Sequence, residues 1–115
     1  MGHLKGLVIL LVAAFSLVAV GCKSEMPAAD GTALYNYIND TSRYTEWRMW
    51  PGKEALYPGT EPHGMLLTTY VTDGAFSAIE GKKGSIPDGS IIVKENYMPD
   101  ETLAAVTVMY KIEGV

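Results

Sequence analysis

The feature that most limits the fold of this chain is an apolar run near its N-terminus, because that run takes residues out of the folded domain. Leu7–Val20 is 14 residues long, Ser16 is its only polar member, and Lys5 precedes it. A helix of this length covers about 21 Å, which is short of the roughly 30 Å hydrocarbon core of a bilayer. A membrane-spanning anchor is therefore the weaker interpretation, and the run is typical of an export signal.

The residues that follow the run resemble a bacterial lipobox. Ala19–Cys22 places small and apolar residues directly before the cysteine. In such signals the cysteine is thioether-linked to diacylglycerol, carries fatty acyl chains such as palmitate, and becomes the new N-terminus. We therefore expect a lipoprotein signal peptide at 1–21, lipidation of Cys22 and a lipidated tether at 22–31. The alternative is an ordinary secretory signal that contains a cysteine.

The charge and the cysteine content of the chain limit the partners and the covalent cross-links that it can have. The chain has 9 Lys+Arg against 13 Asp+Glu, a net charge of −4, so it has no basic patch for nucleic acid. Its single cysteine excludes an intrachain disulfide. Lys23 after the cysteine favours an outer-membrane lipoprotein that faces the periplasm, by the sorting habit of many Gram-negative bacteria. The expected partner is thus the membrane, through the lipid anchor.

The folded part begins with one amphipathic helix. Leu34, Tyr37 and Ile38 recur at helical spacing and form one apolar face. Asp30 or Thr32 is suited to cap the start of this helix. We expect the helix to end within residues 39–42.

The remainder predicts a sheet with one short helix. Pro-Gly signals mark a loop over 52–64 and turns at 81–84 and 86–89, and short turns between neighbouring strands favour antiparallel pairing. The fold class is therefore α+β, with an N-terminal helix and a mostly antiparallel sheet. The expected strands are 65–71, 90–97 and 103–112, and the expected short helix is 73–79.

Alternation in the strand 90–97 separates two sets of side chains. Glu95 shares a face with two apolar residues, whereas Lys94 lies on the opposite face, which is usually the solvated one for a lysine. The two sets are Ile91, Val93 and Glu95 on one face, and Ile92, Lys94 and Asn96 on the other.

Residues with recognisable chemistry are few. No glycine-rich phosphate loop and no His-Glu-x-x-His motif is present. His63 lies in a Pro-Gly loop, where a hydrogen bond to the backbone is a simpler expectation than a zinc site or a catalytic triad. Four aromatic residues lie close in sequence and serve either as core or as a platform for a sugar or a planar cofactor; they are Tyr44, Trp47, Trp50 and Tyr57.

Several strings together resemble the cytochrome P-460 family, which includes the beta-type cytochromes c-prime. They are Tyr44-x-x-Trp47-x-x-Trp50-Pro51-Gly52, Pro62-His63-Gly64, the segment 86–97 with its Pro-Asp-Gly and Val-Lys-Glu, and Val-Met-Tyr-Lys within 106–111. The resemblance extends over roughly 31–114. It implies that 32–115 is a cytochrome P-460-like domain.

The resemblance also implies a cofactor and an activity. Family members carry haem c on a Cys-x-x-Cys-His motif near the C-terminus, and they oxidise hydroxylamine or bind nitric oxide. The lysine of Val-Lys-Glu is the position that cross-links to haem in the enzymes, and it matches Lys94. A small nitrogenous ligand is expected only if haem is present.

This sequence departs from the family because it contains no Cys-x-x-Cys-His motif. We therefore expect no cofactor in this chain as given, and a fold that is incomplete relative to the family, from either a truncated gene or a short haem-less relative. The strand 103–112 would then have an exposed edge and the domain would be marginally stable. Two functions stay open: a fragment of a haem protein, and a non-catalytic binding or structural lipoprotein using the aromatic loop.

Overall fold

The computed structural model describes residues 26–60 and 65–113. The expected signal peptide, Cys22, the first part of the tether and His63 lie outside the described residues. Within the described ranges, no helix is both long enough and apolar enough to cross a membrane.

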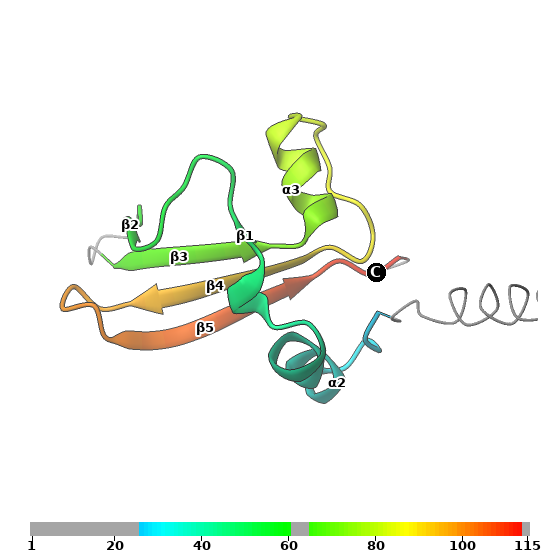
Figure 1. Cartoon of the computed structure of the whole chain (residues 1–115), viewed down its shortest axis with the longest axis horizontal. Helices are drawn as coiled ribbons and strands as arrows, with labels where there is room; N and C mark the ends of the chain where they lie inside the picture. The colour runs from blue at the N-terminus through cyan, green and yellow to red at the C-terminus, as the bar shows by residue number, and fades with distance from the viewer. Residues whose placement is uncertain (1–25, 61–64, 114–115) are drawn as a thin grey trace, which may run out of the picture.

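The core of the fold is one antiparallel sheet with two helical segments, as Figure 1 shows. The strands follow the order β1-β3-β4-β5, and β2 pairs with β3 as well. This arrangement confirms the α+β class. The strands are β1 (Arg48–Met49), β2 (Tyr57–Pro58), β3 (Leu66–Val71), β4 (Ile91–Tyr97) and β5 (Leu103–Tyr110), and the α-helices are α2 (Gly31–Asn36) and α3 (Asp73–Glu80).

The helix α2 begins where the sequence predicts. The Asp30 carboxylate accepts a hydrogen bond from the backbone N–H of Ala33 at 2.8 Å, so Asp30 is the cap and Thr32 is not. The chain continues as a π-helical turn over Tyr37–Thr41, which keeps the end of the helical segment within the predicted range.

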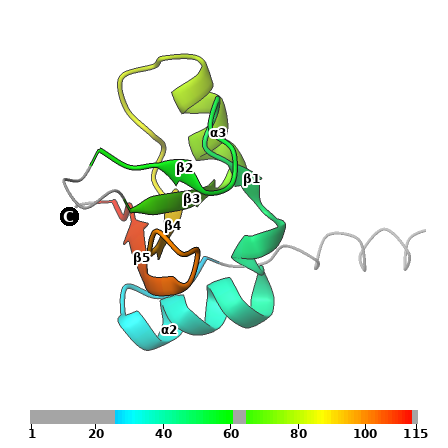
Figure 2. The ribbon, with the colours of Figure 1, turned by 90° about the vertical axis from the view of Figure 1, so that its left-hand side faces the viewer.

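Different helices pack against the two faces of the sheet. We name these faces the α2 face and the α3 face. In Figure 2 the two helices lie on opposite sides of the sheet. The alternation of β4 is as predicted, with Ile91, Val93 and Glu95 buried and Lys94 exposed. The main cluster lies on the α2 face; it consists of Ile38, Ile91 and Val93, with Leu34, Tyr37, Tyr44, Trp47 and Tyr110 packed around them.

The helix α3 covers only part of its face. Ala75 and Ala78 are its buried residues, and the guanidinium carbon of Arg48 lies 4.5 Å from the centre of the Phe76 ring. A single residue, Thr72, connects β3 to α3, so the helix stays at that end of the sheet (Figure 1). The other part of the α3 face is left open.

One two-residue strand lies inside the predicted loop, and another lies just before it. The expectation of a loop over 52–64 is wrong at Tyr57–Pro58, because this pair adds to β3 as β2. Arg48–Met49 pairs with the same strand nearer its end. Strands of two residues are too short to give an alternating pattern, so the sequence contains no signal for them. The last strand also ends earlier than predicted, at Tyr110.

Candidate functional site

A hollow of about 560 Å³ lies on the open part of the α3 face. We name it the Lys94 hollow. Its volume lies within the range of about 300–1,000 Å³ that is usual for small-molecule sites. It is lined by Trp50, Lys53, Tyr57, Thr69, Ile79, Ile86, Ile92, Lys94 and Met109.

The strands form the floor of the Lys94 hollow. Register places Lys94 between Thr69 of β3 and Thr107 of β5. Ile92 and Met109 form the next cross-strand pair on the same face. Because side chains alternate along a strand, this face receives Lys94 while Glu95 goes to the other side. The prediction that Lys94 lies on the exposed face is therefore confirmed.

The walls come from the loop before β2 and from the region around α3. The backbone N–H of Trp50 donates to the carbonyl oxygen of Thr69 at 2.9 Å, and the hydroxyls of Tyr57 and Thr69 lie 2.8 Å apart. The Lys53 ammonium lies 5.2 Å from the centre of the Tyr57 ring. These contacts fix one wall against β3, and Ile79 and Ile86 supply the other.

The charge of the Lys94 hollow has one sign. Among the described residues that line it, the two charged ones are Lys53 and Lys94, and none is a carboxylate. The remaining lining residues are aromatic or apolar, apart from the hydroxyl of Thr69. Such a surface suits a ligand with an apolar body and a negatively charged group.

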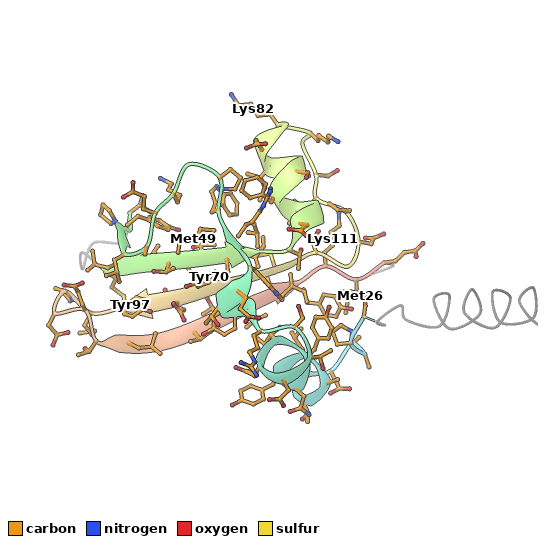
Figure 3. All side chains as sticks on the ribbon, in the orientation of Figure 1. Met26, Met49, Tyr70, Lys82, Tyr97 and Lys111 are labelled. Atoms are coloured by element: carbon orange, nitrogen blue, oxygen red, sulfur yellow. The ribbon has the colours of Figure 1, made fainter. Side chains whose placement is uncertain are left out.

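The α2 face holds a different polar group, a carboxylate surrounded by tyrosines. Glu95 is 8% exposed. Its two oxygens accept hydrogen bonds from the hydroxyls of Tyr44 at 2.7 Å and Tyr97 at 2.8 Å. Tyr70 packs edge-on against Tyr44 with ring centres 5.5 Å apart, and Figure 3 labels Tyr70 on β3 and Tyr97 on β4. The carboxylate is satisfied by these donors, so this cluster joins β4 to the segment before β1.

The tyrosine hydroxyls of this cluster hold their protons tightly. Burial, followed by the hydrogen bond to Glu95, raises the pKa of Tyr44 well above its usual value. The hydrogen bond to Glu95, followed by burial, raises the pKa of Tyr97 to about 12. Burial and the charge of Glu95 raise the pKa of Tyr70 as well. All three are therefore neutral at physiological pH, and the cluster acts as a structural anchor.

The two tryptophans of the aromatic loop do not form one platform. Trp50 lines the Lys94 hollow, whereas Trp47 packs against the core on the α2 face and donates its indole N–H to Ser42 at 3.0 Å. Of the two expectations for the aromatic residues, core packing is therefore confirmed for Trp47. A ligand platform that Trp47 and Trp50 share is not formed, because the two side chains lie in different places.

A second cavity, of about 470 Å³, lies at the start of α3. Ser90 is one of its lining residues, and the buried Ser90 hydroxyl has no hydrogen-bond partner among the described residues. Its lining combines the guanidinium of Arg48 with the carboxylates of Glu46, Asp73 and Asp88. These opposite charges select no single ligand charge, so the Lys94 hollow is the better-defined candidate.

The remaining candidate residues from the sequence, Cys22 and His63, lie outside the described residues. In the part of the chain that the structure covers, no group of three or more His, Cys, Asp or Glu residues is arranged to hold a metal ion. Comparisons with protein-family models, with curated proteins and with solved structures found no match for this chain.

Proposed function

We propose that the protein is a lipid-anchored protein of the bacterial cell envelope that binds a flat, mostly apolar ligand with a negatively charged group in the Lys94 hollow. One observation supports this proposal: an apolar, aromatic-walled hollow of about 560 Å³ in which both charged residues of the described lining are lysines. The proposed anchor is lipid on Cys22, and the proposed location is the outer membrane, facing the periplasm.

The resemblance to cytochromes P-460 supports this class of ligand. Haem is flat, apolar over most of its area and carries two carboxylates. The lysine that matches the cross-linking position of the family, Lys94, lines the hollow, and so does Trp50 from another of the resembling strings. In this proposal 32–115 corresponds to the N-terminal part of the family fold.

Covalent haem c does not fit the residues of this sequence. Thioether attachment requires two cysteines and a neighbouring histidine, and the chain has Cys22 alone. The proposal therefore assigns non-covalent binding to the Lys94 hollow, and it assigns the protein no redox step. The second hypothesis was a binding lipoprotein that uses the aromatic loop. It leads to the same proposed ligand site, because Trp50 of that loop lines the Lys94 hollow.

Titration with protoporphyrin IX tests the ligand class. The full chain, purified from the envelope in detergent, should bind this metal-free ring about as tightly as haemin, because the hollow contributes apolar area and lysines rather than an iron ligand. Lys94→Glu should weaken binding of both at least tenfold, since it replaces attraction by repulsion of the ligand carboxylates.

Lys82→Glu is the matched control. It makes the same change of charge at the tip of the molecule beyond α3, away from the sheet (Figure 3), and should leave binding unchanged. Equal loss in the two variants would show that only net charge matters. Tight binding of haemin without binding of protoporphyrin IX would show that iron ligation, not this surface, holds the ligand.

The anchor has its own test. Wild-type chain should fractionate with membranes and carry the mass of a diacylglyceryl group, whereas Cys22→Ser should be found in the soluble fraction without added mass. A Cys22→Ser variant that still fractionates with membranes would remove the anchor from the proposal and leave the ligand site untouched.

A further inference from the structure

The floor of the Lys94 hollow has a polar end and an apolar end along the strands. Lys94 of β4 is directly opposite Thr69 of β3. Nearer the start of β4, Ile92 is directly opposite Met109 of β5. Alternate residues of a strand are about 7 Å apart. The floor is therefore polar at Thr69 and Lys94, and apolar at Ile92 and Met109.

The walls of the hollow repeat this division. The hydroxyls of Tyr57 and Thr69 lie 2.8 Å apart, so the tyrosine wall meets the polar end of the floor. The Lys53 ammonium lies 5.2 Å from the centre of the same tyrosine ring, which is a cation–π distance. Ile79 and Ile86 line the hollow from the region around α3, and α3 lies at the end of the sheet where β4 begins (Figure 1).

The Tyr57–Thr69 hydroxyl pair has a second proton that no described residue accepts. Each hydroxyl carries one proton, and the hydrogen bond between the two hydroxyls uses only one of them. Within the described ranges, neither hydroxyl has another hydrogen-bond partner. The remaining O–H group can therefore donate to a ligand that supplies an acceptor.

Two ammonium groups accompany this hydroxyl pair. Lys94 is the cross-strand neighbour of Thr69, and Lys53 lies over Tyr57. The described lining holds no carboxylate that would pair with either lysine. The isoleucines and Met109 at the other end offer no hydrogen-bond donor, so a charged group placed there would lose water without gaining a partner.

We propose that the ligand of the Lys94 hollow is an amphiphile with all of its negative charge at one end, and that this end binds at the Tyr57–Thr69 hydroxyl pair. The neighbouring ammonium groups of Lys53 and Lys94 attract the same end, and the apolar part of the ligand lies against the apolar end of the floor. This inference rests on the proposed function and narrows its ligand class. A molecule of equal size and charge with its negative groups at opposite ends fits less well.

Two isomers of naphthalene dicarboxylate test the position of the charge. They have the same ring system and, when fully ionised, the same charge. One has its carboxylates on neighbouring carbons, and the other has them at opposite ends. Each is used to displace protoporphyrin IX, which has both carboxylates on one edge, from the full chain in detergent. We expect the isomer with neighbouring carboxylates to act at a concentration lower by about fivefold or more, because the other isomer leaves one carboxylate without a partner.

The outcomes separate this inference from the proposed function. Equal potency of the two isomers, or no displacement by the isomer with neighbouring carboxylates, would overturn the inference while leaving protoporphyrin IX binding in place. A chain that does not bind protoporphyrin IX at all would overturn the proposed function and the inference together.

Removal of either hydroxyl tests the contact itself. Tyr57→Phe and Thr69→Val should each weaken binding of protoporphyrin IX by about fivefold or more, and of its uncharged dimethyl ester by less than about twofold, because a hydrogen bond to a charged group is the stronger one. Tyr35→Phe is the matched control, since Tyr35 is 66% exposed and is not among the residues that line the hollow. Equal losses for the acid and the ester would show that the hydroxyls only shape the wall. That result, or unchanged binding of the acid in both variants, would overturn the proposal.

Discussion

β4 and β5 lie side by side, and Val93 of β4 is directly opposite Val108 of β5 on the same face of the sheet. Val93 is fully buried, whereas Val108 is 37% exposed. The residue type and the face are the same, so the difference comes from position. Among the described residues, β4 has a strand on both sides and the cluster around Ile38 on its α2 face, while β5 has one neighbouring strand. The packing of other elements against a strand, rather than the apolar character of its residues, therefore decides how much that strand stabilises the fold.

The largest change in stability should come from introducing a carboxylate at one or the other of these two valines. Val93→Asp buries an unpaired carboxylate and should destabilise the domain by more than about 4 kcal/mol, enough to leave little folded protein. Val108→Asp keeps its charge in water and should cost less than about 1 kcal/mol. Urea unfolding followed by near-ultraviolet circular dichroism measures both. Similar losses of stability in the two variants would contradict the conclusion that Val93 is buried by its neighbours and Val108 is not.

A smaller loss of stability is expected from changes in the tyrosine cluster, which lies on the α2 face of β4. Tyr44→Phe removes one of the two donors to the buried Glu95 carboxylate and should destabilise the domain by about 1.5–3 kcal/mol, the usual range for a hydrogen bond to a charged group. Tyr35→Phe is the control, because Tyr35 is exposed and its hydroxyl bonds to none of the described residues. A Tyr44→Phe variant as stable as Tyr35→Phe would show that Glu95 needs no donor from this segment.

The same cluster predicts a dependence of stability on alkaline pH. The pKa of Tyr97 is about 12 in the fold against about 10 in an unfolded chain, and the pKa of Tyr44 is raised in the same direction. The contribution of Tyr97 is fully present below pH 10 and is lost as pH rises from 10 through about 12, because only the unfolded chain ionises in that interval. The contribution of Tyr44 is lost in the same direction, at higher pH. Between pH 10 and about 12, the urea concentration at the unfolding midpoint should fall more steeply with pH in the wild-type protein than in Glu95→Gln. An equal fall in both proteins would disprove the link between tyrosine ionisation and stability.

Much of the framework could be predicted from the sequence, because its signals are local. The capping of α2 by Asp30, the boundaries of α3 and the alternation of β4 each follow from spacing within about ten residues. The two-residue strands β1 and β2 could not, since they exist only as additions to β3.

The candidate site was harder to predict because its walls come from distant segments. Lys53, Tyr57 and Ile86 meet Lys94 only after β3 and β4 have paired. The burial of Glu95 did have a signal, which is its place on the face of Ile91 and Val93. Its hydrogen-bond donors are Tyr44, which lies outside that strand, and Tyr97 at the end of the strand. The exposure of β5 on both faces goes beyond the expectation of an exposed edge.

Two neighbouring residues of β4 allow the most direct test of the central claim, that the α3 face binds ligand while the α2 face holds the fold. Protoporphyrin IX affinity and the urea midpoint are measured together for Lys94→Glu and Glu95→Gln. We predict that Lys94→Glu loses at least tenfold in affinity with its midpoint unchanged, and that Glu95→Gln loses stability while its folded fraction binds as wild type does. Loss of both properties in either variant, or unchanged binding in Lys94→Glu, would contradict this division of roles.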